Sequence, residues 1–110
     1  MVYTLFNVIE KINIDTTIII YGDIIFSLKD LKKIYADKRK LVTLLDFNWK
    51  KLWLTNQKIK YDLESLKISK NIITELGRKT KNPDVIDARY IGITKFSKKT
   101  ISKLLHLKKN

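Results

Sequence analysis

The chain has 110 residues, of which 45% are hydrophobic, and a formal net charge of +12. This length suits one small domain with a single hydrophobic core, so we expect residues 1–110 to form one domain. The absence of cysteine excludes a disulfide framework and a thiolate metal site, and no apolar run reaches the ~18 residues of a membrane span. Because the start of the chain lacks a signal-peptide pattern, the sequence predicts a cytoplasmic protein with no membrane partner.

Lysine supplies nearly all of the positive charge, and the only arginines are Arg39, Arg78 and Arg89. Base readout and bidentate phosphate contacts favour arginine, and the lysines are scattered over every segment of the chain. We therefore interpret the charge as a solvated lysine surface rather than a nucleic-acid interface.

The first half of the chain predicts a helix, a strand, a second helix and a second strand. Apolar residues at helical spacing predict a helix over residues 3–13, and an isoleucine-rich run predicts a strand over residues 17–22. Ser27 followed by Asp30 is a helix-start signal, because the hydroxyl can cap a free amide and the acid suits the positive end of the dipole. A second apolar run over residues 40–46 completes a strand–helix–strand unit, whose sheet would be parallel.

The second half alternates short elements with polar loops. The expected elements are, in order, a helix over residues 48–53, a loop over 54–61, a β-hairpin over 66–76 ended by Gly77, a loop over 78–87, a strand over 88–96, and a last helix capped by Ser97.

Asp23 follows the first strand and needs an explanation. An ionised carboxylate beside a buried strand is costly unless a positive group pairs with it, so an acid at the carboxyl end of a strand is a candidate metal or substrate site. The parallel arrangement would place Asp46, after the second strand, at the same edge of the sheet. An ordinary strand-to-helix loop is the other interpretation of Asp23.

Trp49 and Trp53 are four residues apart, so a short helix would place both on one face. We interpret this pair as core packing, because large aromatic side chains usually supply buried area. His106, the only histidine, lies near the end of a basic helix, where it can interact with the helix dipole, and we do not expect it to be catalytic.

Five motifs occur in a recognisable order, with a helix after the first. They are YGDIIF at residues 21–26, LLDFNWKKLW at 44–53, DLESLKI at 62–68, IITELGRK at 72–79 and ARYIGITKFSKKTISKLL at 88–105. Together they resemble the middle portion of the sugar-phosphate and phosphocholine nucleotidyltransferase family, and the resemblance extends over essentially all of the chain.

The resemblance implies an α/β fold: part of a Rossmann-like nucleotidyltransferase α/β/α sandwich, with a mostly parallel sheet plus a β-hairpin. It implies transfer of a nucleotidyl group from a nucleoside triphosphate, often CTP, to a phosphomonoester such as phosphocholine or a sugar phosphate, with release of pyrophosphate. Both reactants are polyanions, so Mg²⁺ and positive side chains would neutralise charge while the acceptor phosphate attacks the α-phosphorus in line.

The resemblance also implies roles for particular residues. Asp23 matches the magnesium-binding acid of the family's GD motif. Glu64 and Lys79 fall where the family contacts the acceptor, and Tyr90 and Gly92 match the strand that lines the same pocket. Asp46 and Trp49 also match recurrent positions of the family, and we regard a structural role for them as at least as well supported as a functional one.

Several departures from the family pattern limit these expectations. The family begins with a strand and a glycine-rich, phosphate-binding loop that this sequence lacks, and its second metal-binding acid would fall after Asn110. Ala88-Arg89 and Thr80 also replace residues that are frequent in the family. We therefore expect a partial domain, from a fragment, a truncated gene or a split protein, that is inactive as this chain alone.

A partial domain would also leave the first strand with an unpaired apolar edge, which invites pairing with another chain. We therefore expect a homo- or hetero-oligomer that completes the sheet. A non-catalytic partner subunit and a basic nucleic-acid-binding module remain the alternative functions.

Overall fold

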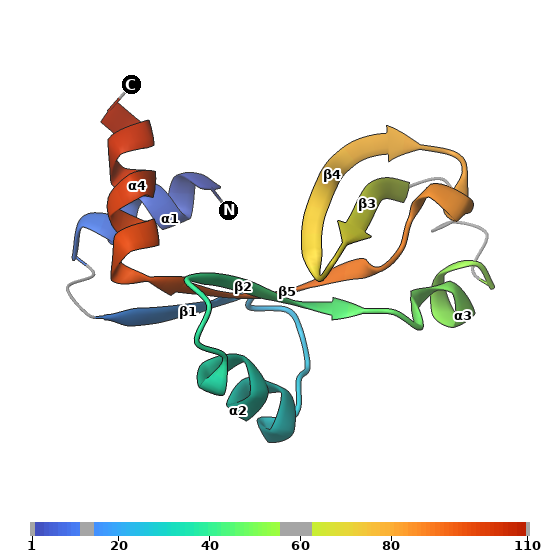
Figure 1. The fold of residues 1–110 in the computed structure, drawn as a ribbon, viewed down its shortest axis with the longest axis horizontal. Helices are drawn as coiled ribbons and strands as arrows, with labels where there is room; N and C mark the ends of the chain where they lie inside the picture. Colours follow the sequence, from blue (N-terminus) through green and yellow to red (C-terminus); the bar gives the residue numbers. More distant parts are fainter. Residues whose placement is uncertain (1, 12–14, 56–62, 110) are drawn as a thin grey trace. The chain divides into compact units, whose positions relative to one another are not determined.

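The computed structural model describes residues 2–11, 15–55 and 63–109, and the chain divides into two compact units (Figure 1). Unit 1 comprises residues 1–44 and 92–110, and unit 2 comprises residues 45–91. The helices are α1 (Val2–Val8), the 3₁₀ turn η1 (Ile9–Lys11), α2 (Leu28–Ala36), α3 (Trp49–Trp53), the 3₁₀ turn η3 (Pro83–Val85) and α4 (Lys98–Lys109). The strands are β1 (Thr16–Ile20), β2 (Leu41–Asp46), β3 (Leu63–Ser69), β4 (Ile72–Thr80) and β5 (Arg89–Ser97).

Unit 1 is built on a three-stranded sheet in the order β1-β5-β2. β1 and β5 pair antiparallel, with Thr16 opposite Ser97 and Ile20 opposite Ile93. On the other side of β5, the amide of Ser97 donates to the carbonyl of Lys40 over 2.8 Å. β5 is therefore the central strand, and β1 and β2 are the edge strands of this sheet in the described part of the chain.

The prediction of a mostly parallel sheet is wrong, because every neighbouring strand pair is antiparallel. The segments expected over residues 17–22, 40–46 and 88–96 do form strands. However, the last of them inserts between the first two, so they are not hydrogen-bonded neighbours. The sequence pattern correctly predicted that these segments are strands. It did not predict their neighbours, because β5, from much later in the chain, pairs with both β1 and β2.

Helices cover both sides of the unit 1 sheet: in Figure 1, α1 and α4 lie on one side of its strands and α2 on the other. Ile34 of α2 is only 1% exposed, while Ile9 of η1 and Ile101 of α4 are also buried. The Lys108 ammonium joins α4 to the first helix, because it donates to the carbonyl of Phe6 and forms an ion pair with Glu10 at 3.1 Å. The architecture is therefore mixed α/β.

The boundaries of α2 and α4 follow from polar side chains. The Ser27 hydroxyl accepts a hydrogen bond from the amide of Asp30, as the sequence predicted, and the Ser97 hydroxyl accepts one from the amide of Thr100. α2 gives way to extended backbone at Asp37, whose carboxylate accepts bonds from both the amide and the guanidinium of Arg39. No described helix combines the length and apolar character that a membrane crossing requires.

Unit 2 contains the predicted hairpin, in which β3 and β4 pair antiparallel. Lys70 and Asn71 both have positive φ, at 51° and 61°, which is the geometry of a tight hairpin turn whose twist matches that of the strands. The prediction that Gly77 ends the hairpin is wrong. Between the pairs Glu64–Lys79 and Leu66–Leu76, β4 carries one residue more than β3.

Gly77, with φ at +83°, therefore lies in a β-bulge, and β4 continues to Thr80. The amide of Arg78 in this bulge donates to the buried hydroxyl of Ser65, so the irregular backbone keeps a hydrogen-bond partner. The loop expected over residues 78–87 is correspondingly shorter and contains η3. Within the loop expected over residues 54–61, only residues 54 and 55 are among those described.

Trp49, Leu63 and Ile86 form the buried core of unit 2, and Trp53 packs against it. The core-packing interpretation of the tryptophan pair is confirmed for Trp49, which is 1% exposed. Asp87 holds the segment after η3 along β3: its amide donates to the Leu66 carbonyl over 2.8 Å, and its carboxylate accepts from the amide of Ile68.

Replacement of Trp49 by alanine is expected to lower the free energy of unfolding by about 3–5 kcal/mol, because it leaves a cavity in this core. Leu52→Ala is the matched control, since Leu52 lies on the same helix but is 72% exposed, and it should change stability little. Urea titration followed by circular dichroism measures both variants. Equal effects of the two substitutions would contradict the assignment of Trp49 to the core.

Candidate functional site

Asp23 lies in an exposed turn directly after β1. The strand ends at Ile20, and the amide of Tyr21 then donates to the carbonyl of Gly92 over 2.9 Å, which fixes the start of the turn against β5. Among the described residues, nothing forms a hydrogen bond or an ion pair with the Asp23 carboxylate. This carboxylate is thus held at the end of a strand while its oxygens remain available to a ligand.

A depression of about 510 Å³ adjoins this turn within unit 1. Leu5 and Val8 of α1 form one part of its lining, and Ile19 and Ile20 of β1 form another. Among the described residues of the lining, Asp23 is the only charged one. An apolar surface ending in one carboxylate can hold an apolar part of a ligand while the acid binds a cation.

Position 92 requires glycine, because of both its backbone conformation and its close contact with Tyr21. Its φ is +91°, which side-chain-bearing residues rarely adopt, and a Cβ there would come within 2.7 Å of the Tyr21 ring. Gly22, in contrast, has open space around the position of a Cβ. Gly92 therefore lets the Tyr21 ring pack against β5, and so shapes the strand end that carries Asp23.

The described residues provide one carboxylate for a metal ion at this turn, and no group of three histidine, cysteine or acidic side chains is close enough together to hold one. Magnesium usually keeps several waters and binds through one or two carboxylates plus substrate phosphates. An exposed single carboxylate fits that mode, in which the triphosphate supplies the other ligands. It does not fit a dedicated protein cage.

Glu64 and Lys79 come together in unit 2. They are direct partners across β3 and β4, and their charged groups are 3.7 Å apart. Both side chains are more than half exposed, so solvent screens the pair and its contribution to stability is small. The hairpin therefore presents a cation and an anion side by side on its surface, where each can also contact a ligand.

The remaining candidate residues, apart from His106, are half-buried, hydrogen-bonded at a turn or packed in the core. Tyr90 is half-buried in β5. The Asp46 carboxylate accepts a hydrogen bond from the amide of Asn48 over 2.8 Å, at the start of the turn into α3. Trp49 fills the core of unit 2, and His106 is exposed near the end of α4.

The structure thus groups the sequence-predicted residues into two sets. Asp23 lies in unit 1 with Gly92, which touches the neighbouring Tyr21. Glu64, Lys79 and Tyr90 lie in unit 2, as does Asp46. The expectation that Asp23 and Asp46 share one edge of a sheet concerns residues of different units and stays a prediction.

Two charged arrangements were not anticipated from the sequence. In unit 2 the Arg89 guanidinium stacks 3.7 Å from the centre of the Trp53 ring. In unit 1 Lys95 is only 5% exposed although it is charged. A signal for the second was present: Ile93 and Lys95 share one face of β5, so a lysine stands where the alternation calls for an apolar residue.

Comparison with known proteins shows that the chain is similar in sequence to a nucleotidyltransferase. One relative is a CTP:phosphoglutamine cytidylyltransferase of Campylobacter jejuni subsp. jejuni serotype O:2, which is 36% identical over 89 residues. The matched region covers 80% of this chain, and the chain spans only about a third (35%) of the length of that relative. No family model matches the chain, and no solved structure matches it.

Substitution of Gly92 by alanine is expected to destabilise the protein by about 1–3 kcal/mol, because it adds backbone strain to the contact with Tyr21. Gly22→Ala is the control and should have little effect, since no atom crowds that position. Chemical denaturation compares the two variants.

The double variant Tyr21→Ala/Gly92→Ala separates the two causes. It should remove the clash between the new Cβ and the ring but keep the strain at φ +91°, so it should show less than the sum of the two single effects. Fully additive losses would show that contact with the Tyr21 ring is not what requires glycine here.

Proposed function

We propose that this chain belongs to the nucleotidyltransferase family and acts in a cytidylyltransferase, transferring CMP from CTP to a phosphorylated small molecule. The homology to a cytidylyltransferase is the observation that carries the proposal. The exposed Asp23 carboxylate supports it, because a triphosphate needs a cation site at the reacting phosphates. The acceptor would be a phosphomonoester, such as a phosphorylated amide, phosphocholine or a sugar phosphate.

In this reaction an oxygen of the acceptor phosphate attacks the α-phosphorus of CTP. A new oxygen–phosphorus bond forms, the bond to the β-phosphate bridging oxygen breaks, and pyrophosphate leaves with that electron pair. Asp23 would hold Mg²⁺ together with triphosphate oxygens. Bound Mg²⁺ would neutralise the charge that repels two polyanionic reactants and that accumulates on the departing pyrophosphate.

The Glu64–Lys79 pair would contact the acceptor. The Lys79 ammonium suits an acceptor phosphate, and the adjacent Glu64 carboxylate suits a cationic group such as an amine or a quaternary ammonium. The register of β3 and β4 places the two opposite charges side by side across the hairpin. An acceptor with a phosphate and a positive group could therefore pair with both side chains.

A non-catalytic role has one specific observation in its favour. In the described residues β1 pairs on one side only, and its three isoleucines are partly exposed, so the strand can add another strand at its free edge. A subunit of this kind would form a stable complex with a second chain but would contribute no group to catalysis. Sensitivity of turnover to Asp23 and Lys79 distinguishes the two roles.

Replacement of Asp23 by asparagine is expected to reduce kcat/KM about 100-fold or more, because the neutral amide is a much weaker ligand for a cation at the reacting phosphates. The natural gene product that contains these residues is assayed for pyrophosphate release with CTP, Mg²⁺ and either phosphoglutamine or phosphocholine. Asp84→Asn is the control, since it removes one acid whose side chain is 85% exposed.

Unchanged turnover in Asp23→Asn would make the metal assignment wrong. If no phosphorylated acceptor supported pyrophosphate release, and CTP did not bind in a Mg²⁺-dependent manner, the cytidylyltransferase proposal itself would fall. The 110-residue chain tested alone in the same assay is expected to give no measurable turnover.

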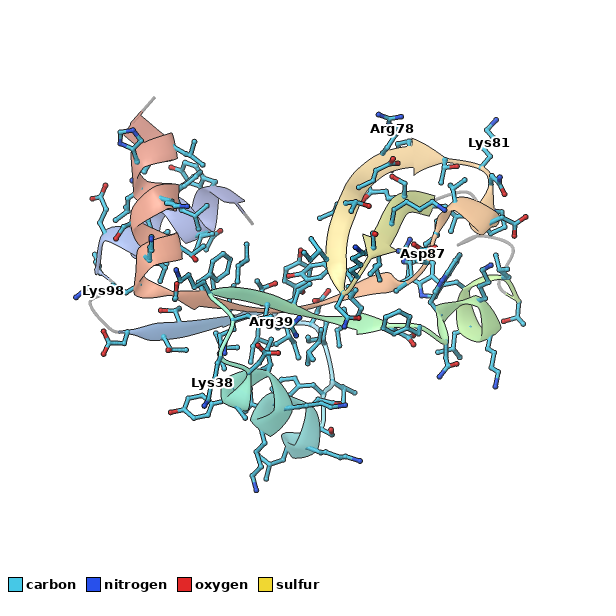
Figure 2. The ribbon with its side chains drawn as sticks, in the orientation of Figure 1. Lys38, Arg39, Arg78, Lys81, Asp87 and Lys98 are labelled. Atoms are coloured by element: carbon cyan, nitrogen blue, oxygen red, sulfur yellow. The ribbon has the colours of Figure 1, made fainter. Side chains whose placement is uncertain are left out.

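Substitution of Lys79 by alanine is expected to raise the KM for the acceptor about tenfold and to leave the KM for CTP unchanged, because a charge-assisted contact to the acceptor phosphate is lost. Lys81→Ala is the control, since it removes an exposed positive charge two residues further along the chain (Figure 2). Steady-state kinetics with each substrate varied in turn measure both variants. An equal rise for CTP and acceptor would contradict the assignment.

A further inference from the structure

A second concave region of unit 1 lies at the end of β1 opposite to Asp23. It has a volume of about 360 Å³, and its lining includes Thr16 at the start of β1 and Ser97 at the end of β5. Since β1 has five residues and a strand rises about 3.3 Å per residue, the strand alone separates this region from the Asp23 turn by roughly 15 Å. It is therefore distinct from the candidate catalytic site.

The lining of this region is positively charged. In the part of the lining that the structure describes, Lys38, Arg39 and Lys95 contribute three cations, and Asp37 is the single anion. Figure 2 shows Lys38 and Arg39 in the segment that leaves α2 for β2. The Thr16 hydroxyl is a neutral group that can donate a hydrogen bond, whereas the Ser97 hydroxyl is engaged with Thr100 at the start of α4.

The Asp37 carboxylate is already paired with Arg39. The Asp37 carboxylate receives the Arg39 guanidinium in two-pronged fashion, with Nε at 3.0 Å from Oδ1 and Nη2 at 2.6 Å from Oδ2, and it also accepts from the Arg39 amide. These hydrogen bonds hold the pKa of Asp37 well below its usual range, so the group is ionised at neutral pH. Asp37 therefore balances Arg39, and no second acid among the described lining residues balances Lys38 and Lys95.

Lys95 is the most informative of these cations, because only 5% of its surface is exposed to solvent. Its ammonium donates to the backbone carbonyl of Asp37, and it forms no other hydrogen bond or close ion pair with a described residue. An ammonium carries three donors, and a buried charge is costly without full pairing. The buried end of this side chain therefore has donors to spare inside a positively charged cavity.

From this arrangement we infer that the Lys38–Lys95 cavity is a binding site for a phosphate group, carried by free phosphate, by pyrophosphate or by a nucleotide. The excess of two positive charges matches a phosphate dianion, and a buried lysine with spare donors near the Thr16 hydroxyl supplies hydrogen bonds to its oxygens. Such a ligand would join the end of α2 to β1 and β5. Binding would therefore stabilise unit 1 and would not require Asp23.

The test is titration of the purified chain with inorganic phosphate, pyrophosphate and CDP at constant ionic strength, with chloride as the reference anion, followed by calorimetry and by thermal unfolding. Saturable binding is expected, and Lys38→Ala should weaken it about fivefold. Lys103→Ala is the matched control: it removes one exposed lysine from α4, gives the same net charge, and should leave the affinity unchanged.

Lys95→Met removes the buried ammonium and keeps most of the side-chain volume, and circular dichroism verifies that the variant is folded. If it binds phosphate as well as the wild type does, the inference is wrong. Equal weakening by Lys38→Ala and Lys103→Ala would also overturn it, since that result describes nonspecific attraction to a basic protein. Absence of saturable binding of all three ligands would do the same.

The CDP measurement identifies the source of the phosphate. Equal affinity for pyrophosphate and CDP indicates that the cavity reads phosphate alone, and tighter CDP binding that Lys38→Ala weakens indicates a nucleotide; both results support the site. Asp23→Asn should leave phosphate binding at this cavity intact. The cavity and the proposed catalytic function can therefore fail independently.

Discussion

The hydrogen bonding of β5 to two other strands is the interaction on which unit 1 depends. β1 and β2 do not pair with each other, so without β5 the N-terminal segments of this unit would have no sheet. The pairing of β1 with β5 is followed by the hydrogen bond from the Tyr21 amide to the Gly92 carbonyl, where a side chain at position 92 would occupy the space of the Tyr21 ring. The turn that carries Asp23 begins directly after this contact.

The sequence predicted the helices and strands of this fold better than it predicted which strands pair with each other. The cap at Ser27, the strands and the hairpin follow from hydrogen bonding within a few residues and from side-chain periodicity, both of which can be read along the chain. The parallel sheet was wrong because pairing joins segments separated by dozens of residues, here residues 16–20 and 93–97. Gly77 was misread because a glycine after an apolar run signals a turn and a bulge equally well.

The candidate site shows the same division. Asp23 was identifiable because an acid after a long apolar run is conspicuous. The premise of a buried strand was wrong, since β1 is an edge strand whose isoleucines are partly exposed, and the metal-binding role of Asp23 stays a prediction. The Glu64–Lys79 pair required the strand register, since the two residues are fifteen positions apart and meet only when β3 and β4 are aligned. The cavity around Lys95 required the tertiary structure, because Asp37 and Lys95 lie on opposite sides of unit 2 in the sequence.

The division of the chain has a consequence for how the protein reaches its folded state. Unit 2 is one continuous segment, whereas unit 1 is assembled from residues on both sides of it. The sheet of unit 1 can therefore form only when the ends of the intervening segment are brought together, and closing a flexible loop costs more entropy as the loop lengthens. Prior formation of the β3–β4 hairpin, with its tight Lys70-Asn71 turn, shortens the flexible part of that loop. From this loop-closure argument we expect that early folding of unit 2 lowers the entropic cost of bringing β5 to β1 and β2.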